Sequence, residues 1–181
     1  MSLDFDSARL PNIHLKAEHH EWRAQLRRFF EREVIPFAAQ WDEDGCIPDE
    51  LWPKSAAVGM LGLGFPEEFG GVSEGIDIWY GIILNEEMAR IAVGGVAASL
   101  MVHGIGLPPV INFGSDEVKQ MVAPPVLAGT KRISLAVTEP GAGSDVAHLT
   151  TTARLEGDYY VVNGSKTYIT GGMNANWFTT A

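Results

Sequence analysis

The chain has little cysteine, little positive charge and no long hydrophobic run. Cys46 is the single cysteine among 181 residues, which excludes a disulfide framework within the chain. Only 13 basic residues stand against 23 acidic ones, giving a formal net charge of -10. Nucleic acid is therefore not expected as a partner, because binding it requires a basic surface. The longest weakly polar stretch, Ile91 to Val102, is too short to span a bilayer, so no membrane partner is expected.

The start of the chain and its composition predict a cytoplasmic globular protein. Residues 1–6, MSLDFD, have neither a basic n-region nor an apolar h-region, so we predict no signal peptide. Hydrophobic residues make up 46% and charged residues 20%, as in proteins with a sizeable core. The short basic run alternates with glutamates and is predicted to form a solvated helix face. Its residues are Arg23, Arg27, Arg28 and Arg32.

Up to residue 129 the apolar residues recur at helical spacing. Pro36 is predicted to end or kink the first helix at Ile35. Asp49 is predicted to cap a helix that ends near Gly59, and Ser115 to cap a later one. Residues 76–91 and 93–112 are predicted to form two apolar helices inside a bundle. Glu86 and Glu87 are predicted at the surface, with Arg90 as a partner one turn away.

After residue 129 the period changes to two, which indicates strands. Asn163-Gly164 is predicted as a two-residue hairpin turn. Because no helix is predicted between the strands, they should form one antiparallel sheet. The fold class is therefore α+β, with an α-helical domain over residues 1–129 and the first strands of a β-domain over residues 130–181. The last strand would leave an unpaired edge, so we expect the front part of a longer protein. The predicted strands cover residues 133–138, 150–155, 159–162, 166–170 and 177–181.

Three motif-like strings fail on their context. GAGSDV at 141–146 follows a strand but lacks the third glycine and the helix of a dinucleotide fingerprint. GSKT at 164–167 lacks the Gly-Lys pair of a phosphate loop. A histidine cluster near the N-terminus has a spacing that does not bring two imidazoles to one helix face, so no metal site is predicted. The cluster is formed by His14, Glu18, His19 and His20.

The loop after the first predicted strand carries the strongest signal. Residues Thr138 to Asp145 form a polar, Gly-rich turn that can bring backbone N–H groups and two hydroxyls against a flat polar ligand or an oxyanion. The same composition also suits an ordinary tight connection. However, LAVTEPGAGSD at 135–145 and GDYYVVNGSKTYITG at 157–171 closely resemble the flavin-loop signature of acyl-CoA dehydrogenases. Earlier strings match the family in the same order, namely PEEFGG at 66–71, EEMAR at 86–90 and FGS at 113–115.

The resemblance implies an N-terminal helical domain, a middle β-domain and a C-terminal four-helix domain, the last of which this chain lacks. It implies FAD as cofactor and a homotetramer. It also implies that Ser144 contacts the CoA side of the substrate. By the same analogy the acyl pocket is lined by residues around Leu100, Met101, His103 and Gly104, and the packing of a central helix is the alternative role of these residues. Tyr168 stands where many members have Trp, and a cross-strand packing role is its alternative. The flavin contacts implied are Leu135, Ala136, Val137, Thr138, Gly143, Ser144, Tyr168, Ile169 and Thr170.

The implied activity is α,β-dehydrogenation of an acyl-CoA, as in fatty acid or amino acid catabolism, with electron-transfer flavoprotein as acceptor. A base removes the α-proton while hydride leaves the β-carbon for the flavin. The family's base is a glutamate expected beyond Ala181, so no catalytic residue is assigned here; Glu139 is expected to hold the turn. The alternatives are an acyl-CoA oxidase, another flavoenzyme on this fold such as nitroalkane oxidase, or a non-catalytic truncated paralogue that binds a partner chain.

Overall fold

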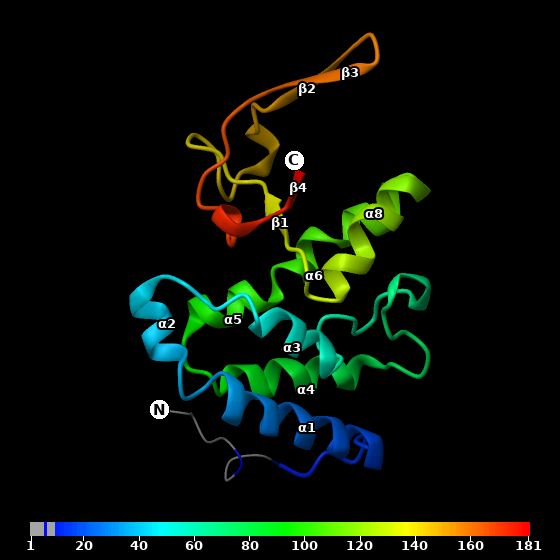
Figure 1. The fold of residues 1–181 in the computed structure, drawn as a ribbon, viewed down its shortest axis with the longest axis vertical. Coiled ribbons are helices and arrows are strands. Elements are labelled where there is room, and N and C mark those ends of the chain that lie inside the picture. Colours follow the sequence, from blue (N-terminus) through cyan, green and yellow to red (C-terminus); the bar gives the residue numbers. More distant parts are fainter. Residues whose placement is uncertain (1–5, 7–9) are drawn as a thin grey trace.

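The computed structural model describes residue 6 and residues 10–181. The stretch examined for a signal peptide, residues 1–6, therefore lies outside the described residues except for Asp6. The helices pack together and the strands follow them at one end of the molecule, so the predicted α+β class is confirmed (Figure 1). The helices are α1 (Ala17–Glu33), α2 (Ala38–Asp44), α3 (Leu51–Ala57), α4 (Ile78–Ala89), α5 (Gly94–Met101), α6 (His103–Gly106), α7 (Pro108–Phe113) and α8 (Asp116–Leu127).

Local signals set most helix ends. Helix α1 ends at Glu33, ahead of Pro36, as predicted. The Ser115 hydroxyl accepts a hydrogen bond from the Val118 N–H at 3.3 Å and caps α8, also as predicted. The predicted cap at Asp49 is wrong, because Glu50 occupies that position and the Asp49 carboxylate instead pairs with Arg132.

The apolar segment predicted as one helix over residues 93–112 is divided into α5, α6 and α7. The last break falls at Leu107, where Pro108 begins α7 and cannot donate the backbone hydrogen bond that a continuous helix needs. The break lets α6 lie directly on the strand that follows the helices. A Cβ on Gly106 would lie only 3.2 Å from the Ser134 carbonyl carbon, so this contact favours glycine.

Two apolar clusters form the core. The larger one lies among α1, α3, α4 and α5, and the smaller one lies among α8, η2 (Glu67–Phe69) and the first strand. Fully or almost fully buried members of the larger cluster are Leu26, Phe30, Val34, Met60, Leu61, Ile83, Ile91 and Leu100. Those of the smaller cluster include Leu107, Val122, Ala123, Val126 and Ile133.

The burial of Glu87 contradicts two predictions, namely its own surface position and the solvated helix face assigned to the basic run. Its side chain is fully buried, and it accepts hydrogen bonds from Arg23 at 3.0 Å and from Arg27 at 2.8 and 2.9 Å. Arg23 and Arg27 are therefore not part of a solvated face; they join α1 to α4 through a buried carboxylate. Glu86 is half-exposed and pairs with Arg23 at 2.6 Å, nearer the surface as expected.

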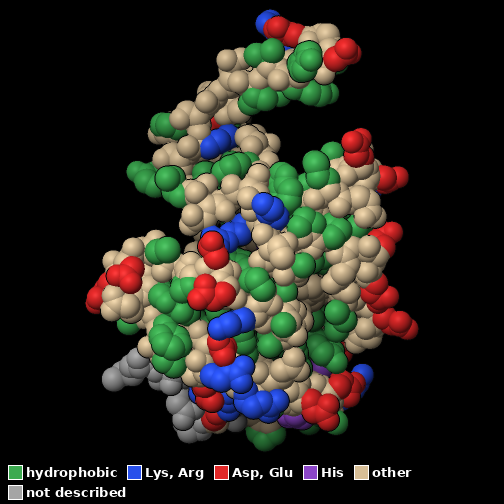
Figure 2. Space-filling model, in the orientation of Figure 1, with side chains coloured by type: hydrophobic (Ala, Val, Ile, Leu, Met, Phe, Trp, Pro, Cys, Tyr) green, Lys and Arg blue, Asp and Glu red, His purple; other side chains and the backbone are tan. Residues whose placement is uncertain are grey.

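The strands do not form one antiparallel sheet. Strand β1 (Ile133–Ala136) pairs in parallel with β4 (Trp177–Thr180), while β2 (Thr152–Glu156) and β3 (Tyr159–Asn163) form a separate antiparallel hairpin. A parallel pair needs a long crossover, which residues 137–176 provide, including η3 (Val146–His148) and η4 (Gly172–Asn174). The hairpin stands out from the body and exposes apolar side chains (Figure 2).

The predicted turn at Asn163-Gly164 and the returning strand at 166–170 are also wrong. The hairpin turns at Gly157-Asp158, since Glu156 pairs with Tyr159 and Gly157 has a φ of 62°. Gly164 instead lies against Thr151, where an added Cβ would approach the threonine Oγ1 to 2.2 Å. The chain leaves β3 there and runs back toward the end of β1.

No single helix in the described part of the chain is long and apolar enough to cross a membrane. One bent combination, α5 with the segment His103–Phe113 at 41°, meets that criterion by length and composition alone.

Candidate functional site

The loop that leaves β1 is closed by a single buried carboxylate. Glu139 accepts hydrogen bonds from the backbone N–H groups of Thr150 and Thr151, at 2.7 and 2.8 Å, and from both hydroxyls. Lys166 adds an ion pair at 2.9 Å. These bonds from Thr151, Thr150 and Lys166 hold the pKa of Glu139 well below its usual range. The prediction that Glu139 holds the turn is confirmed, and so strongly stabilised a carboxylate is a poor proton acceptor.

The end of β1 and the segment after β3 lie side by side. The Lys166 ammonium donates to the Val137 carbonyl at 2.8 Å, and the Thr167 N–H donates to the Thr138 carbonyl at 2.9 Å. The Ser134 hydroxyl donates to the Thr170 carbonyl at 2.8 Å. The structure therefore brings together two groups of predicted flavin contacts that are far apart in sequence, residues 135–138 and residues 168–170.

Tyr168 presents its ring to solvent. Its side chain is 92% exposed and its φ is 57°, a left-handed conformation that costs an L-residue about 1–2 kcal/mol. The alternative cross-strand packing role is wrong, because the residue lies in no strand. Its backbone is held on both sides by the bonds from Thr167 and to Thr170. An exposed aromatic ring on a fixed backbone is suited to stacking on a flat ligand.

The Gly-rich turn between Glu139 and Thr150 is exposed. Glu139 and Ala142 exchange backbone hydrogen bonds across it, and Gly143 and Ser144 lie on its outer side. Asp145 pairs with His148 at 2.6 Å. Within the described residues the hydroxyls of Thr138 and Ser144 have no hydrogen-bond partner, so both remain available to a ligand.

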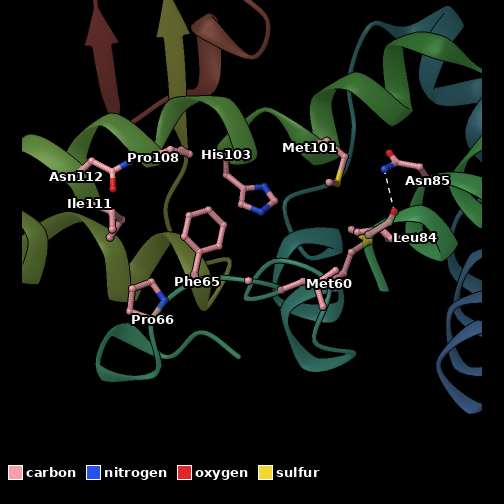
Figure 3. A pocket seen from close by; sticks show the side chains of 14 residues that line it. Met60, Phe65, Pro66, Leu84, Asn85, Met101, His103, Pro108, Ile111 and Asn112 are labelled. Carbon is pink, nitrogen blue, oxygen red and sulfur yellow. Dashed lines mark hydrogen bonds between the residues drawn. The ribbon is translucent and has the colours of Figure 1, made fainter. Parts of the chain in front are cut away.

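Met101 and Gly104 line a separate pocket of about 510 Å³. Figure 3 shows Met101 and His103 reaching into it from the α5–α6 segment, with Phe65 and Met60 on the opposite wall. The His103 ring bonds to the Leu61 carbonyl at 3.0 Å, and burial lowers the pKa of this histidine. Sequence reasoning missed the walls contributed by α4 and by residues 60–66. These walls include Met60, Leu63, Phe65, Pro66, Gly81, Leu84 and Asn85.

Helix α6 separates this pocket from the predicted flavin contacts. On the opposite side, Val102, which directly precedes α6, lies against Gly171, and Gly106 of α6 lies against β1. A smaller cavity of about 220 Å³ lies on that side, lined among others by Val102, Ser134, Ile169 and Gly171. The structure thus brings Ile169 to β1 but does not bring Met101 and Gly104 to the same cavity. Leu100 is buried in the larger core cluster.

No group of three or more histidine, cysteine, aspartate or glutamate side chains in the described ranges could hold a metal ion. Two members of the early histidine cluster have other partners: His19 is buried and bonds to Asp77 at 3.1 Å, and His14 stacks on Trp79.

Comparison with known proteins identifies the family. Residues 16–130 match the acyl-CoA dehydrogenase N-terminal domain and residues 134–181 match the acyl-CoA dehydrogenase middle domain. The long-chain specific acyl-CoA dehydrogenase of Sus scrofa mitochondria is 38% identical over 156 residues, which are 86% of this chain and 36% of that protein. An acyl-CoA dehydrogenase structure from Geobacillus kaustophilus, 36% identical, aligns with a TM-score of 0.81 over 94% of this chain and 44% of that one.

A Bacillus anthracis acyl-CoA dehydrogenase complexed with FAD is 32% identical and aligns with a TM-score of 0.80, covering 94% of this chain and 29% of that one. The chain thus spans less than half the length of the relatives it matches. Both domain matches and the relatives' identities agree with the loop signature and the fold described above. The chain belongs to the acyl-CoA dehydrogenase family.

Proposed function

We propose that this chain supplies the flavin-facing part of an FAD-dependent enzyme that removes hydrogen from the α and β carbons of an acyl-CoA thioester. The observation that carries the proposal is the juxtaposition of residues 135–138 with residues 168–170, joined by Thr167 and Ser134. The FAD bound to the Bacillus anthracis relative supports the choice of cofactor. When bound, FAD supplies the hydride acceptor for this chemistry.

The residues at this edge fit a flavin. The backbone of Leu135, Ala136 and Val137 and the Thr138 hydroxyl would bond its polar edge, and Tyr168, Ile169 and Thr170 would cover its ring plane. Gly143 lets the backbone approach closely, and Ser144 would bond both the cofactor and the CoA side of the substrate. The exposed Tyr168 ring and the two available hydroxyls support these roles. The proton acceptor is proposed to come from a glutamate outside residues 1–181.

The domain boundary, the cellular location, the oligomeric state and the electron acceptor are part of the same proposal. We propose a helical domain over residues 1–129 joined to the start of a β-domain at residue 130, acting in a cytoplasmic homotetramer. Electron-transfer flavoprotein would take the electrons. The rate at which oxygen reoxidises the reduced flavin distinguishes the proposed dehydrogenase from an oxidase.

Replacing Thr138 tests the flavin edge. Thr138→Ala removes one hydroxyl hydrogen bond, typically about 0.5–1.5 kcal/mol, so FAD affinity should fall about two- to tenfold without a change in folding. The measurement is titration of FAD fluorescence, with circular dichroism as the folding check. Thr152→Ala, on the exposed strand β2, is the matched control and should leave FAD affinity unchanged. Identical FAD affinity and absorption in the Thr138 variant would show that this hydroxyl does not face the ring.

A second substitution tests the proposal that the pocket at Gly104, across α6 from the proposed flavin contacts, receives the acyl chain. A Cβ at Gly104 meets no atom within 4 Å, so Gly104→Leu should fill the pocket without disturbing the helix. If the added side chain displaces about three methylenes of a bound acyl chain, affinity for the longest acyl-CoA accepted should fall on the order of 50-fold. Calorimetry with acyl-CoA thioesters of increasing length measures this. Gly94→Leu, at an exposed position with equal space, is the control. Equal loss for short and long chains would contradict the assignment.

A further inference from the structure

One ion pair joins every segment that carries a proposed flavin contact. Glu139 lies directly after residues 135–138, and its carboxylate also holds Thr150 and Thr151, where the turn containing Gly143 and Ser144 ends. Lys166 lies two residues before Tyr168. The pair therefore connects the end of β1, the end of the turn and the start of the 168–170 segment at one point.

The pair is shielded from solvent. The Glu139 side chain is 3% exposed and the Lys166 side chain 11%, with their charged atoms 2.9 Å apart. A shielded ion pair whose remaining bonding capacity is satisfied by hydrogen bonds holds its geometry more firmly than a surface pair. Here the carboxylate accepts four further bonds from the two threonines.

The lysine also reaches the proposed flavin edge itself. Its ammonium bonds the Val137 carbonyl at 2.8 Å, and the next residue, Thr167, bonds the Thr138 carbonyl at 2.9 Å. Both carbonyls are thereby fixed in direction. Loss of either charge would release the peptide groups whose orientation the flavin requires.

We infer that the Glu139–Lys166 ion pair is a positioning device that sets the spacing between residues 135–138 and residues 168–170 to the dimensions of the flavin ring. This inference rests on the proposed function. Neither residue is assigned a contact with the flavin or the substrate. Their effect is transmitted through Val137, Thr138 and Tyr168.

The test is a double-mutant cycle on the FAD-binding protein. Glu139→Gln removes the negative charge at nearly constant shape, and Lys166→Met removes the positive charge while keeping an apolar stem. Each should lower FAD affinity about ten- to a hundredfold and shift the visible absorption maxima of the bound flavin, because bonds to a charged group are lost at the edge that orients it. The double variant should lose less affinity than the two single losses combined.

The matched control is the exposed pair Arg154–Glu156 on strand β2. Arg154→Met and Glu156→Gln should leave both the FAD affinity and the flavin spectrum unchanged. If Glu139→Gln does not fold, Thr151→Val removes one hydroxyl donor, keeps the ion pair, and should still shift the spectrum and weaken FAD binding about two- to tenfold.

Additive losses in the double variant, or single variants with unchanged affinity and spectrum, would overturn the inference while leaving the proposed function intact. Failure of the unchanged protein to take up FAD would overturn the proposed function and the inference together. A lower unfolding temperature with an unchanged flavin spectrum would also overturn it, because the pair would then stabilise the loop without positioning the flavin.

Discussion

Residues 1–181 loaded with FAD should keep their flavin absorption when mixed anaerobically with acyl-CoA thioesters of several chain lengths. Removal of a general base lowers rates by about 10² to 10⁴, and among the described residues no carboxylate near the proposed flavin edge is free to act as one. Glu139 is bound by two threonines and a lysine, and Asp145 is paired with His148 on an exposed turn. Stopped-flow absorbance of the oxidised flavin measures the rate.

The control for this experiment is the Bacillus anthracis acyl-CoA dehydrogenase complexed with FAD, whose flavin should be bleached under the same conditions by an acyl-CoA thioester. Bleaching of the FAD-loaded 181 residues at a comparable rate would contradict the proposal that the base lies outside them. In that event Glu139 and Asp145 would be the first residues to replace.

Loss of the buried carboxylate between α1 and α4 should strongly destabilise the fold. In Glu87→Gln the guanidinium groups of Arg23 and Arg27 keep their burial but lose a carboxylate that bonds both. Breaking a buried ion pair by removing one partner typically costs about 3–5 kcal/mol. For a chain of this length that corresponds to a fall in Tm of about 6–20 °C, measured by circular dichroism.

The neighbouring variant Glu86→Gln is the matched control, because Glu86 pairs with Arg23 but is 41% exposed. Its effect should stay within about 1 kcal/mol. Equal Tm values for the two variants would contradict the buried network.

The same network should make stability fall in acid. Burial raises the pKa of Glu87, but the hydrogen bonds from Arg27 and Arg23 outweigh it, and the net shift is below the ordinary value of 4.5. The stabilisation is therefore complete above about pH 4.5 and is lost as the pH falls through the lowered pKa of the folded state. The difference in Tm between the unchanged protein and Glu87→Gln should narrow over that acidic range. A difference that stays constant would contradict this origin of the stability.

Local chemistry made much of the helical half predictable. Pro36 excludes a continuous helix, and the Ser115 hydroxyl is the acceptor that α8 needs at its start. The burial of Glu87 also had a signal, since it follows the buried Ile83 by four positions and Leu84 by three. The surface prediction gave more importance to its charge than to its place on the buried face.

The strand pairing could not be derived locally. Asn163-Gly164 and Gly157-Asp158 are both acceptable two-residue turns, and the choice depends on Gly164 fitting against Thr151. The parallel pairing of β1 with β4 depends on a crossover of many residues whose course no short pattern specifies. The flavin loop was identified by the resemblance of its sequence to a family signature. The pocket walls at Met60 and Gly81 could not be identified in this way, because they come from separate segments that only the fold brings together.

FAD binding is the claim on which the rest depends, and titration of the purified protein with FAD and FMN tests it most directly. The protein should quench FAD fluorescence, give a structured visible absorption band, bind FAD more tightly than FMN, and release intact FAD on denaturation. A colourless protein that leaves the fluorescence of added FAD unchanged, or one that binds FMN as tightly as FAD, would contradict the flavin edge proposed for residues 135–138 and 168–170.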